Sequence, residues 1–343
     1  GGGCSRRAAA AGHTRLRASG ADHRTAVHPS KGRTMSTQTT GEAVGSAQQV
    51  PGMRGVQAAG PAESTFDKDF EAPERRTVGA GTEGLAISGA SHGDRLTQMR
   101  EGTLGSIHSW ELVTAVDGPG TRMTVFFAGC PLRCLYCHNP DTFKMKDGES
   151  VTSDELLRRI RRYRALFRAT GGGLTISGGE VLMQPAFAAT ILKGAKAEGI
   201  HTTIDTSGYL GASCTDEMLE NIDLVLLDVK SGDEATYKKV TGRELQPTLD
   251  FGRRLAAKDI EIWLRFVLVP GLTDDVENVE KVAQYAATLS SVSRVEVLPF
   301  HQMGLDKWKT LGLKYELADA EPPSKELLER VRDQFRSKGL TVY

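Results

Sequence analysis

The sequence contains few cysteines, no long apolar segment and no excess of charge of either sign. Only five of its 343 residues are cysteine, and three of them, Cys130, Cys134 and Cys137, lie within one stretch of eight residues. This distribution is unlike a disulfide framework and indicates a reducing compartment. No run approaches the roughly 18 apolar residues that a membrane-spanning helix needs, so we expect a soluble protein without a membrane partner.

The charge balance removes a second class of partner. Lysine and arginine together number 43, as do aspartate and glutamate, so the formal net charge is zero. An even balance gives no electrostatic reason to propose nucleic acid as a partner. With 39% hydrophobic residues, the chain has enough apolar content for a folded core in one large or two small domains. We expect a monomer.

The chain changes character near residue 104. Residues 1–33 carry seven basic residues against a single acid, Asp22, and no apolar run. This composition resembles an organellar transit peptide, which would place the protein in a chloroplast or mitochondrion; a disordered tail on a cytoplasmic protein is the alternative. Residues 35–104 are rich in small and polar residues without sustained periodicity, which predicts a linker. We therefore divide the chain into a leader with its linker, 1–104, and one folded domain, 105–343.

From residue 105 onward, short apolar runs alternate with amphipathic segments. The runs predict buried strands at 123–128, 174–177, 201–205, 223–229, 261–268 and 294–299. Helical patterns lie between and after them at 153–169, 183–198, 215–221, 246–258, 276–290 and 324–338. Six such units predict an α/β fold with a parallel sheet and helical crossovers, either as an open doubly wound sheet or as a full or partial barrel.

Polar residues follow the predicted strands at the same end in nearly every unit. They are the cysteine stretch, Ser177 to Glu180, Asp205 with Thr206, Asp228 with Lys230, and His301, while Arg265 lies inside a strand. In barrels of parallel strands the chemistry gathers at the carboxyl ends of the strands. Each residue alone has an ordinary explanation, such as a turn or a helix cap. Their recurrence at one end predicts a shared site.

The three clustered cysteines have the spacing C-x3-C-x2-C and lack a well-placed fourth partner. Structural zinc is held by four ligands, and here the fourth would be His138, which is adjacent to Cys137 and poorly placed to share its metal. Ferredoxin-type clusters also take four cysteines. Three thiolates would instead hold three corners of a [4Fe–4S] cube and leave one iron open to an outside ligand. A zinc-binding module without catalytic activity stays as the alternative.

Several motifs around the cysteines point to one family. The stretch GSIHSWELVTAVDGPGTRMTVFFAGCPLRCLYCHNPDTF is followed in order by GGGLTISGGEVLMQPAF, DTSG, VLLDVK, LRFVLVPGLTDD and LPFHQMG. Together these motifs resemble the pyruvate formate-lyase-activating enzymes, a family of radical SAM proteins, over residues 105–343 and not over 1–104. The resemblance implies a partial (β/α)6 barrel, a [4Fe–4S] cluster on Cys130, Cys134 and Cys137, and S-adenosylmethionine chelated to the open iron.

The resemblance also implies an activity and its partners. One electron from the reduced cluster would cleave S-adenosylmethionine to methionine and a 5′-deoxyadenosyl radical, and the radical would remove a hydrogen from the α-carbon of one glycine in pyruvate formate-lyase. A reduced flavodoxin or ferredoxin would donate the electron. Activases of other glycyl radical enzymes share the barrel, but many carry an insert with further cysteines after the first motif. Residues 138–213 contain no cysteine, which favours the pyruvate formate-lyase type.

The family's cofactor-binding residues carry over to the predicted strand ends. They are Tyr136, Cys137, His138, Gly178, Gly179, Glu180, Asp228, Val229, Lys230 and His301. The two glycines lack side chains, so the backbone can closely approach the amino group of the methionine moiety. Asp228 and Lys230 supply an acceptor and a cation for the ribose hydroxyls or the methionine moiety. Hydrogen abstraction needs no general acid or base, so no further catalytic residue is expected.

A monovalent cation is a further expectation from the resemblance. The residues that would hold it, or lie near the bound glycine loop, are Asp117, Asp205, Thr206 and Asp228. For Asp117 the sequence Asp-Gly-Pro-Gly offers an alternative, a tight turn. Leu226 stands where a methionine is familiar in the family, and Ser207 replaces an asparagine. A backbone carbonyl can still serve from Leu226, so the cation site is weakened rather than lost.

Overall fold

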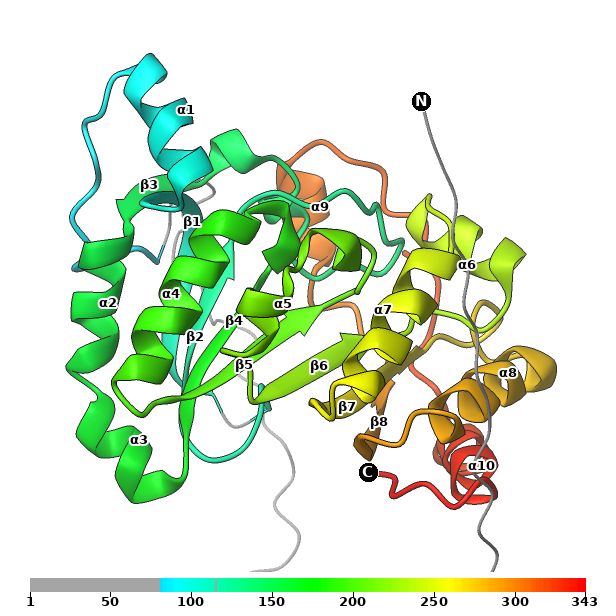
Figure 1. The fold of residues 1–343 in the computed structure, drawn as a ribbon. Helices are drawn as coiled ribbons and strands as arrows, with labels where there is room; N and C mark the ends of the chain where they lie inside the picture. Colours follow the sequence, from blue (N-terminus) through cyan, green and yellow to red (C-terminus); the bar gives the residue numbers. More distant parts are fainter. Residues whose placement is uncertain (1–80, 115) are drawn as a thin grey trace, which may run out of the picture. The chain divides into compact units, whose positions relative to one another are not determined.

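The protein, described here from a computed structural model, is built on an eight-stranded sheet (Figure 1). The structure describes residues 81–114 and 116–343. Six strands are parallel and follow one another across the sheet: β2 (Arg122–Phe127), β4 (Gly173–Gly178), β5 (His201–Thr206), β6 (Leu224–Asp228), β7 (Glu261–Leu268) and β8 (Val292–Pro299). Beyond β2, the antiparallel strands β1 (Leu104–Thr114) and β3 (Glu149–Thr152) extend the sheet.

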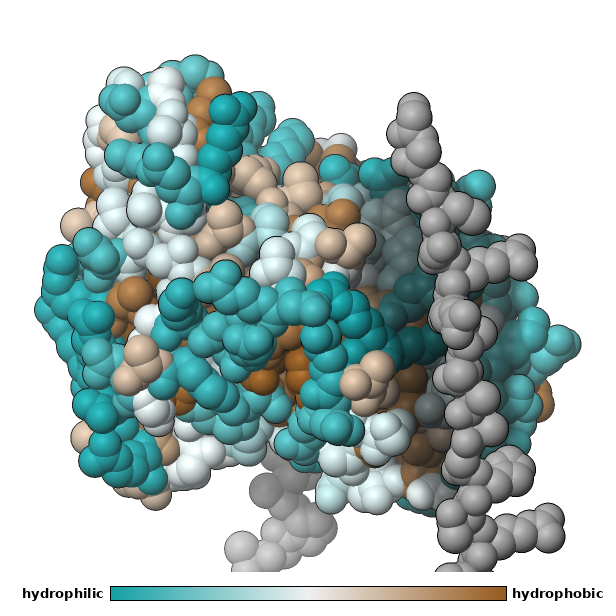
Figure 2. All heavy atoms as spheres, viewed as in Figure 1, coloured by the Kyte–Doolittle hydropathy of each residue, from teal (hydrophilic) through white to brown (hydrophobic). Residues whose placement is uncertain are grey.

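Helices cover the outer face of the parallel strands. Figure 1 shows α4, α5 and α7 in front of the sheet, and Figure 2 shows that the solvent side of this layer is mostly hydrophilic, with apolar atoms in the gaps. The helices that follow the strands are α2 (Ser153–Arg161), α3 (Arg164–Thr170), α4 (Pro185–Ala197), α5 (Asp216–Leu219), α7 (Gln246–Ala257), α8 (Val276–Ala287) and α10 (Lys325–Arg336). Two short helices, α6 (Glu234–Thr241) and α9 (Leu305–Thr310), follow β6 and β8.

The predicted parallel core is confirmed, with differences at its margins. Each of the six predicted strands is present within two residues of its expected start. Around the barrel, the strands β1 and β3 and the helices α6 and α9 were not expected. The helix expected at 153–169 is two helices, α2 and α3, because the chain turns at Arg162 and Tyr163, whose amides bond to carbonyls three residues back. The ring of Tyr163 packs on Trp110 of β1, with centroids 6.2 Å apart, a contact that the local pattern does not encode.

The two faces of the parallel strands differ in polarity. On β2, the side chains of Met123, Val125 and Phe127 are fully buried in the main hydrophobic core. On the opposite face, Thr124 lies in register with Thr175 of β4, which lies in register with a threonine of β5, and all three are fully buried. A sheet that buries polar residues on its inner face encloses an interior of its own, as a barrel does.

The barrel is open, as the resemblance implies. The sheet order places β8 at one edge, separated from β2 by the other four parallel strands, and the outer edge of β8 meets Val342 near the chain end instead. The partial (β/α)6 barrel is therefore confirmed. Within the described residues, no helix is long and apolar enough to cross a membrane.

The segment before the barrel contains structure that the sequence analysis did not expect. Helix α1 (His92–Glu101) lies in the predicted linker, is capped by Ser91, and packs near α4. Its side chains are all at least partly exposed, so it lacks the apolar periodicity that would have revealed it. Nearby, Leu85 joins the hydrophobic core. The predicted leader, 1–33, lies outside the described residues, and the boundary at 105 stays a prediction.

Candidate functional site

The carboxyl ends of the parallel strands surround a cavity of about 450 Å³. We call it the inner cavity. The predicted site residues that line it are Cys130, Cys134, Tyr136, Cys137, His138, Gly178, Gly179, Asp205, Thr206, Asp228, Lys230 and His301. These residues come from every parallel strand end except that of β7, which contributes Arg265 and Val267 from within the strand. The fold therefore brings together most of the residues that the sequence singled out.

The cysteine loop, residues 129–138, is fixed by backbone hydrogen bonds to two neighbouring segments. On one side, the amides of Gly129 and Cys130 donate to the carbonyls of Thr142 and Phe143, at 2.7 and 3.2 Å. On the other, the amides of Arg133 and Leu135 donate to carbonyls at the end of α6, at 2.8 and 3.0 Å. The unexpected helix α6 is thus part of the frame that holds the three cysteines.

Helix α9 supports the same loop through its tryptophan. The indole Nε1 of Trp308 donates to the carbonyl of Cys137 at 2.8 Å. The Trp308 ring also meets Phe143 edge to face, with centroids 5.8 Å apart. Neither aromatic residue was a predicted site residue. The only signal in the sequence was Phe143, an apolar residue close to the cysteine motif. An apolar residue alone does not show whether it supports the cysteine loop or belongs to the hydrophobic core.

The glycine pair after β4 packs directly against the cysteine loop. Gly178 has φ +115°, and a Cβ there would lie 2.3 Å from the backbone of Phe127. A Cβ on Gly179 would lie 2.4 Å from the carbonyl oxygen of Gly129. The following amide, that of Glu180, donates to the same carbonyl at 2.9 Å. Both positions need glycine because strand and loop approach too closely for any side chain.

A partly buried ion pair lines the inner cavity. The ammonium group of Lys230 is 2.5 Å from the carboxylate of Asp228 and 5.8 Å from the centre of the Tyr136 ring. Burial alone would lower the pKa of Lys230, but the Asp228 carboxylate, together with Tyr136 and Cys134, outweighs it, so the pKa is raised well above its usual value. The lysine therefore carries a fixed positive charge beside the cysteines.

Arg265 organises a second set of charges. Its guanidinium lies 3.0 Å from Glu296, 3.5 Å from Asp205 and 3.9 Å from Asp117. Asp205 also accepts from the hydroxyl of Ser177 at 2.7 Å. Burial and the nearby carboxylates of Asp228 and Asp117 raise the pKa of Asp205 to about 6, against the opposing effect of Arg265. Asp205 thus titrates close to neutrality.

Two buried polar atoms at this site lack a partner within the described part of the chain. They are the hydroxyl of Tyr136 and the Nδ1 atom of His301. The His301 ring stacks on His138 with centroids 4.2 Å apart, joining the end of β8 to the cysteine loop. Burial raises the pKa of Tyr136 well above its usual value, so the hydroxyl stays protonated. Buried polar atoms usually find partners, so these two indicate a ligand in the cavity.

Comparison with known proteins identifies the family. The chain is 47% identical over 233 residues to the pyruvate formate-lyase-activating enzyme of Clostridium pasteurianum. The matched region covers 68% of this chain and 98% of that protein. It is 40% identical over 241 residues to the pyruvate formate-lyase 1-activating enzyme of Escherichia coli strain K12, covering 70% and 98%. The radical SAM superfamily model matches residues 124–284. The chain belongs to the pyruvate formate-lyase-activating enzyme family of radical SAM proteins.

Membership of the radical SAM superfamily implies a [4Fe–4S] cluster and S-adenosylmethionine as cofactors, and the cysteine loop fits the cluster. Burial raises the pKa of all three thiols, that of Cys137 to about 12. Such thiols ionise only beside a compensating positive charge, which bound iron supplies. The cysteines share the inner cavity with the glycine pair and Lys230, and a further ligand of the cluster has room there.

Zinc fits the same radical SAM loop less well. Within residues 81–114 and 116–343, no group of three or more histidine, cysteine, aspartate or glutamate side chains is arranged to hold one metal ion. Zinc needs its ligands around a single point, whereas a cube presents its irons at separate corners. The zinc-binding alternative therefore has no geometric support in this family member.

Three of the residues carried over from the family do not line the inner cavity. Glu180 is buried and accepts from Thr206, at 2.6 Å, and twice from Ser207, at 2.5 and 3.0 Å. It therefore positions two residues that line the cavity and is itself out of reach of a ligand there. Val229 is fully buried, and its amide donates to the carbonyl of Arg265. Asp117 lies behind the lining, next to Val116, which does line the cavity.

The position of Glu180 follows from its surroundings. Its predicted role came from the GGE segment as a unit, but the backbone turns after Gly179 to bond to the cysteine loop, which directs the next side chain into the core. Ser207, which departs from the family's asparagine, supplies both an amide and a hydroxyl to this carboxylate. The structure places the Glu180 carboxylate against Thr206 and Ser207, and its role in cofactor binding stays a prediction.

Proposed function

We propose that this protein activates pyruvate formate-lyase by generating a glycyl radical on it. When bound, the [4Fe–4S] cluster supplies the electron that cleaves S-adenosylmethionine to methionine and a 5′-deoxyadenosyl radical, which takes the α-hydrogen of a glycine in the partner. The observation that carries the proposal is the inner cavity itself. It joins three partly buried thiols, a side-chain-free glycine pair and two buried polar atoms that have no partner within the described residues, all at the carboxyl ends of one barrel.

The chain's own residues bind and orient the substrate in this proposal. Tyr136 and His301 offer their free polar atoms to the adenosyl part, since both lie beside the cysteines. Lys230 offers its fixed charge to the carboxylate of the methionine moiety, and Asp228 holds the lysine in place. Gly178 and Gly179 keep the wall beside the cluster free of side chains. The strand ends surround the cavity, so a bound glycine loop would exclude water from the reacting atoms.

The family supports pyruvate formate-lyase as the partner. The relatives that this chain matches over most of their length are named as activating enzymes of pyruvate formate-lyase. The glycine loop of the partner would enter past Val116, which lines the cavity and is 73% exposed. A reduced flavodoxin or ferredoxin would supply the electron, and the protein would act as a monomer.

A monovalent cation is a finer part of the proposal. Asp205, Thr206 and Asp228 line the same cavity, and Leu226, on the same strand as Asp228, lies in register with Asp205. Any such cation competes with the protein's own charges, because Arg265 lies beside Asp205 and Lys230 beside Asp228. Potassium stimulation of S-adenosylmethionine cleavage tests the role: we expect it to disappear in Asp205→Ala, and undiminished stimulation in that variant would remove the cation from the proposal.

The proposed function is tested with the full chain, reconstituted anaerobically with iron and sulfide and reduced by dithionite. S-adenosylmethionine and pyruvate formate-lyase are added, and electron paramagnetic resonance is used to detect a glycyl radical doublet. We expect the doublet together with stoichiometric 5′-deoxyadenosine, and we expect Cys134→Ala to lose both. Cleavage without the doublet would contradict the partner, and an intact reduced cluster without cleavage would contradict the reaction.

A further inference from the structure

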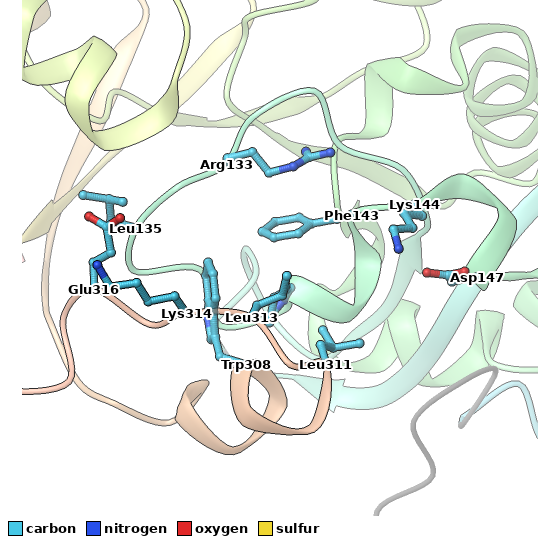
Figure 3. Close-up of a pocket in the computed structure, with 11 residues that line it drawn as sticks. Arg133, Leu135, Phe143, Lys144, Asp147, Trp308, Leu311, Leu313, Lys314 and Glu316 are labelled. Atoms are coloured by element: carbon cyan, nitrogen blue, oxygen red, sulfur yellow. The ribbon is translucent and has the colours of Figure 1, made fainter.

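A second cavity, of about 330 Å³, lies on the outer side of the cysteine loop (Figure 3). We call it the outer groove; its lining includes Arg133, Leu135, Phe143, Lys144, Trp308 and Lys314. Figure 3 shows Phe143 in the middle, with Arg133 on one side and Trp308 and Leu313 on the other. The function proposed above assigns no role to this groove.

The cysteine loop separates the outer groove from the inner cavity and presents a different set of side chains to each. Cys134 and Tyr136 line the inner cavity, whereas the residues between and before them, Leu135 and Arg133, line the outer groove. Phe143 lines both. Phe143 therefore borders both the outer groove and the cavity that the cysteines line.

The groove wall is bonded to the backbone of the cysteine residues themselves. Arg133 donates to the carbonyl of Cys130 at 2.7 Å and lies over the Phe143 ring, 4.6 Å from its centre. Trp308 donates to the carbonyl of Cys137 and contacts Phe143 edge to face. A molecule seated in the outer groove would be separated from the cysteines by one layer of side chains.

The inner cavity is not available to an electron donor during the proposed reaction, because S-adenosylmethionine and the glycine loop fill it. The electron must then reach the cluster through the other face of the loop. We infer that the outer groove is the docking site of an acidic electron-carrier protein, with Phe143 and Trp308 between the carrier and the cluster. This inference rests on the function proposed above.

The surface of the outer groove has the character of a protein interface. Leu311 and Leu313, which line the groove with Trp308, are 37% and 42% exposed, so apolar side chains are open to a partner there. An interface with an apolar centre and a charged rim is the common pattern in transient complexes. The volume suits one or two side chains of a partner, with the remaining contact made around the rim.

The charges of the rim favour an acidic partner. Lys144 and Lys314 are exposed, and among the described residues neither has a carboxylate within ion-pair distance. With Arg133 they outnumber the two acids of the lining, Asp147 and Glu316. At the end of α6, which is bonded to the same loop, Lys238, Lys239 and Arg243 add further exposed positive charge. Complementary charge steers association and sets orientation.

The transfer itself needs no chemistry from the groove. One electron leaves the reduced flavin or iron–sulfur centre of the carrier, which is oxidised by one electron, and enters the cluster, which is reduced by one. No bond forms or breaks, and no proton has to cross. The groove therefore needs only to hold the carrier close, as the aromatic layer allows.

The first test is a binding measurement with the reconstituted full chain and oxidised flavodoxin, an acidic flavin protein, by isothermal titration. We expect Lys144→Glu/Lys314→Glu to raise Kd by about tenfold or more, and we expect wild-type binding to weaken between about 50 and 300 mM salt. Arg168→Glu is the matched control, because Arg168 is an exposed arginine on α3, beside the amino end of β4. An unchanged Kd in the double variant would overturn the inference.

The second test compares two reductants for S-adenosylmethionine cleavage. With limiting reduced flavodoxin, we expect the double variant to cleave about tenfold more slowly than wild type; with dithionite, which needs no docking, we expect equal rates. Equal loss with both reductants would overturn the inference, since the substitutions would then act on the cluster. Absence of dithionite-driven cleavage in the wild type would instead count against the proposed function, and the binding measurement would still decide whether flavodoxin docks.

Discussion

Two buried arginines lie towards opposite ends of the barrel, and their surroundings differ. Arg122, at the start of β2, is fully buried. It donates to uncharged acceptors: the hydroxyls of Thr175 and Thr203, at 2.5 and 2.9 Å, and the carbonyl of Pro119, at 3.1 Å. Burial lowers its pKa to about 10, although Asp117 partly opposes this. It remains charged at neutral pH, held by hydrogen bonds.

Arg265 is also buried, but its partners are carboxylates. Glu296, Asp205 and Asp117 lie within 3.0 to 3.9 Å of its guanidinium, and they outweigh burial to raise its pKa. At the amino ends of the strands, Arg122 donates hydrogen bonds to the threonine hydroxyls of the inner face. Further along the strands, Arg265 balances the carboxylates beside the inner cavity. The comparison shows one barrel using the same side chain for stability near one end and for site electrostatics near the other.

Of the substitutions that compare the two arginines, Arg122→Met is expected to change the free energy of unfolding most. Removing the guanidinium leaves the hydroxyls and carbonyls around it without their donor in a fully buried place. We expect the free energy of unfolding to fall by about 3–5 kcal/mol, with little change between about pH 5 and 8, because its direct partners are mostly uncharged. Urea unfolding at both pH values measures it. A loss below about 1 kcal/mol would contradict the structural role.

Arg265→Met should give a loss that depends on pH. Without the arginine, the pKa of Asp205 rises above its present value of about 6, so the ionised carboxylates destabilise the fold increasingly as pH rises. We expect the free energy of unfolding to fall by about 2–4 kcal/mol at pH 8 and by clearly less at pH 5. The same urea series measures it. A loss that is independent of pH would erase the contrast with Arg122.

Asp205→Asn sharpens the comparison from the carboxylate side. The pKa of Asp205 is about 6 in the folded protein and near 3.8 when unfolded, so the folded state binds its proton more tightly. As pH rises from about 4 to 6, wild type should therefore lose about 1–3 kcal/mol relative to the variant, with no further change above that range. Unfolding in buffer whose only cation is tetramethylammonium avoids competition from potassium. A constant difference across this range would show that Asp205 does not titrate there.

The smallest effect is expected from Trp308→Phe, which removes one hydrogen bond from the cysteine loop and keeps the aromatic ring. We expect the free energy of unfolding of the metal-free chain to fall by about 1 kcal/mol. The matched control is Trp110→Phe, since the indole of Trp110 also donates to a backbone carbonyl, that of Glu83, away from the loop. Iron content after reconstitution should fall only in Trp308→Phe. Equal iron in the two variants would show that the bond to Cys137 does not support the cluster.

The sequence determined the parallel core and the chemistry at its end. Buried parallel strands are apolar runs, and their crossovers are amphipathic helices, so both patterns are local and were predicted within a few residues. The cysteine spacing and the polar residues after the strands are equally local. Because parallel strands end at one face, the sequence order alone was enough to predict that these residues meet.

The surroundings of that core depend on contacts between residues far apart in the sequence. Strand β1 mixes polar and apolar residues, and its pairing with β2 and β3 gives it a sheet to join. The Glu180 side chain is buried because the hydroxyls of Thr206 and Ser207, at the end of β5, donate hydrogen bonds to its carboxylate. Phe143 and Trp308 are separated by more than half of the barrel's sequence, and their contact forms the outer groove only when the chain closes on the cysteine loop. Such features depend on distant partners, and no local pattern of residues encodes a distant partner.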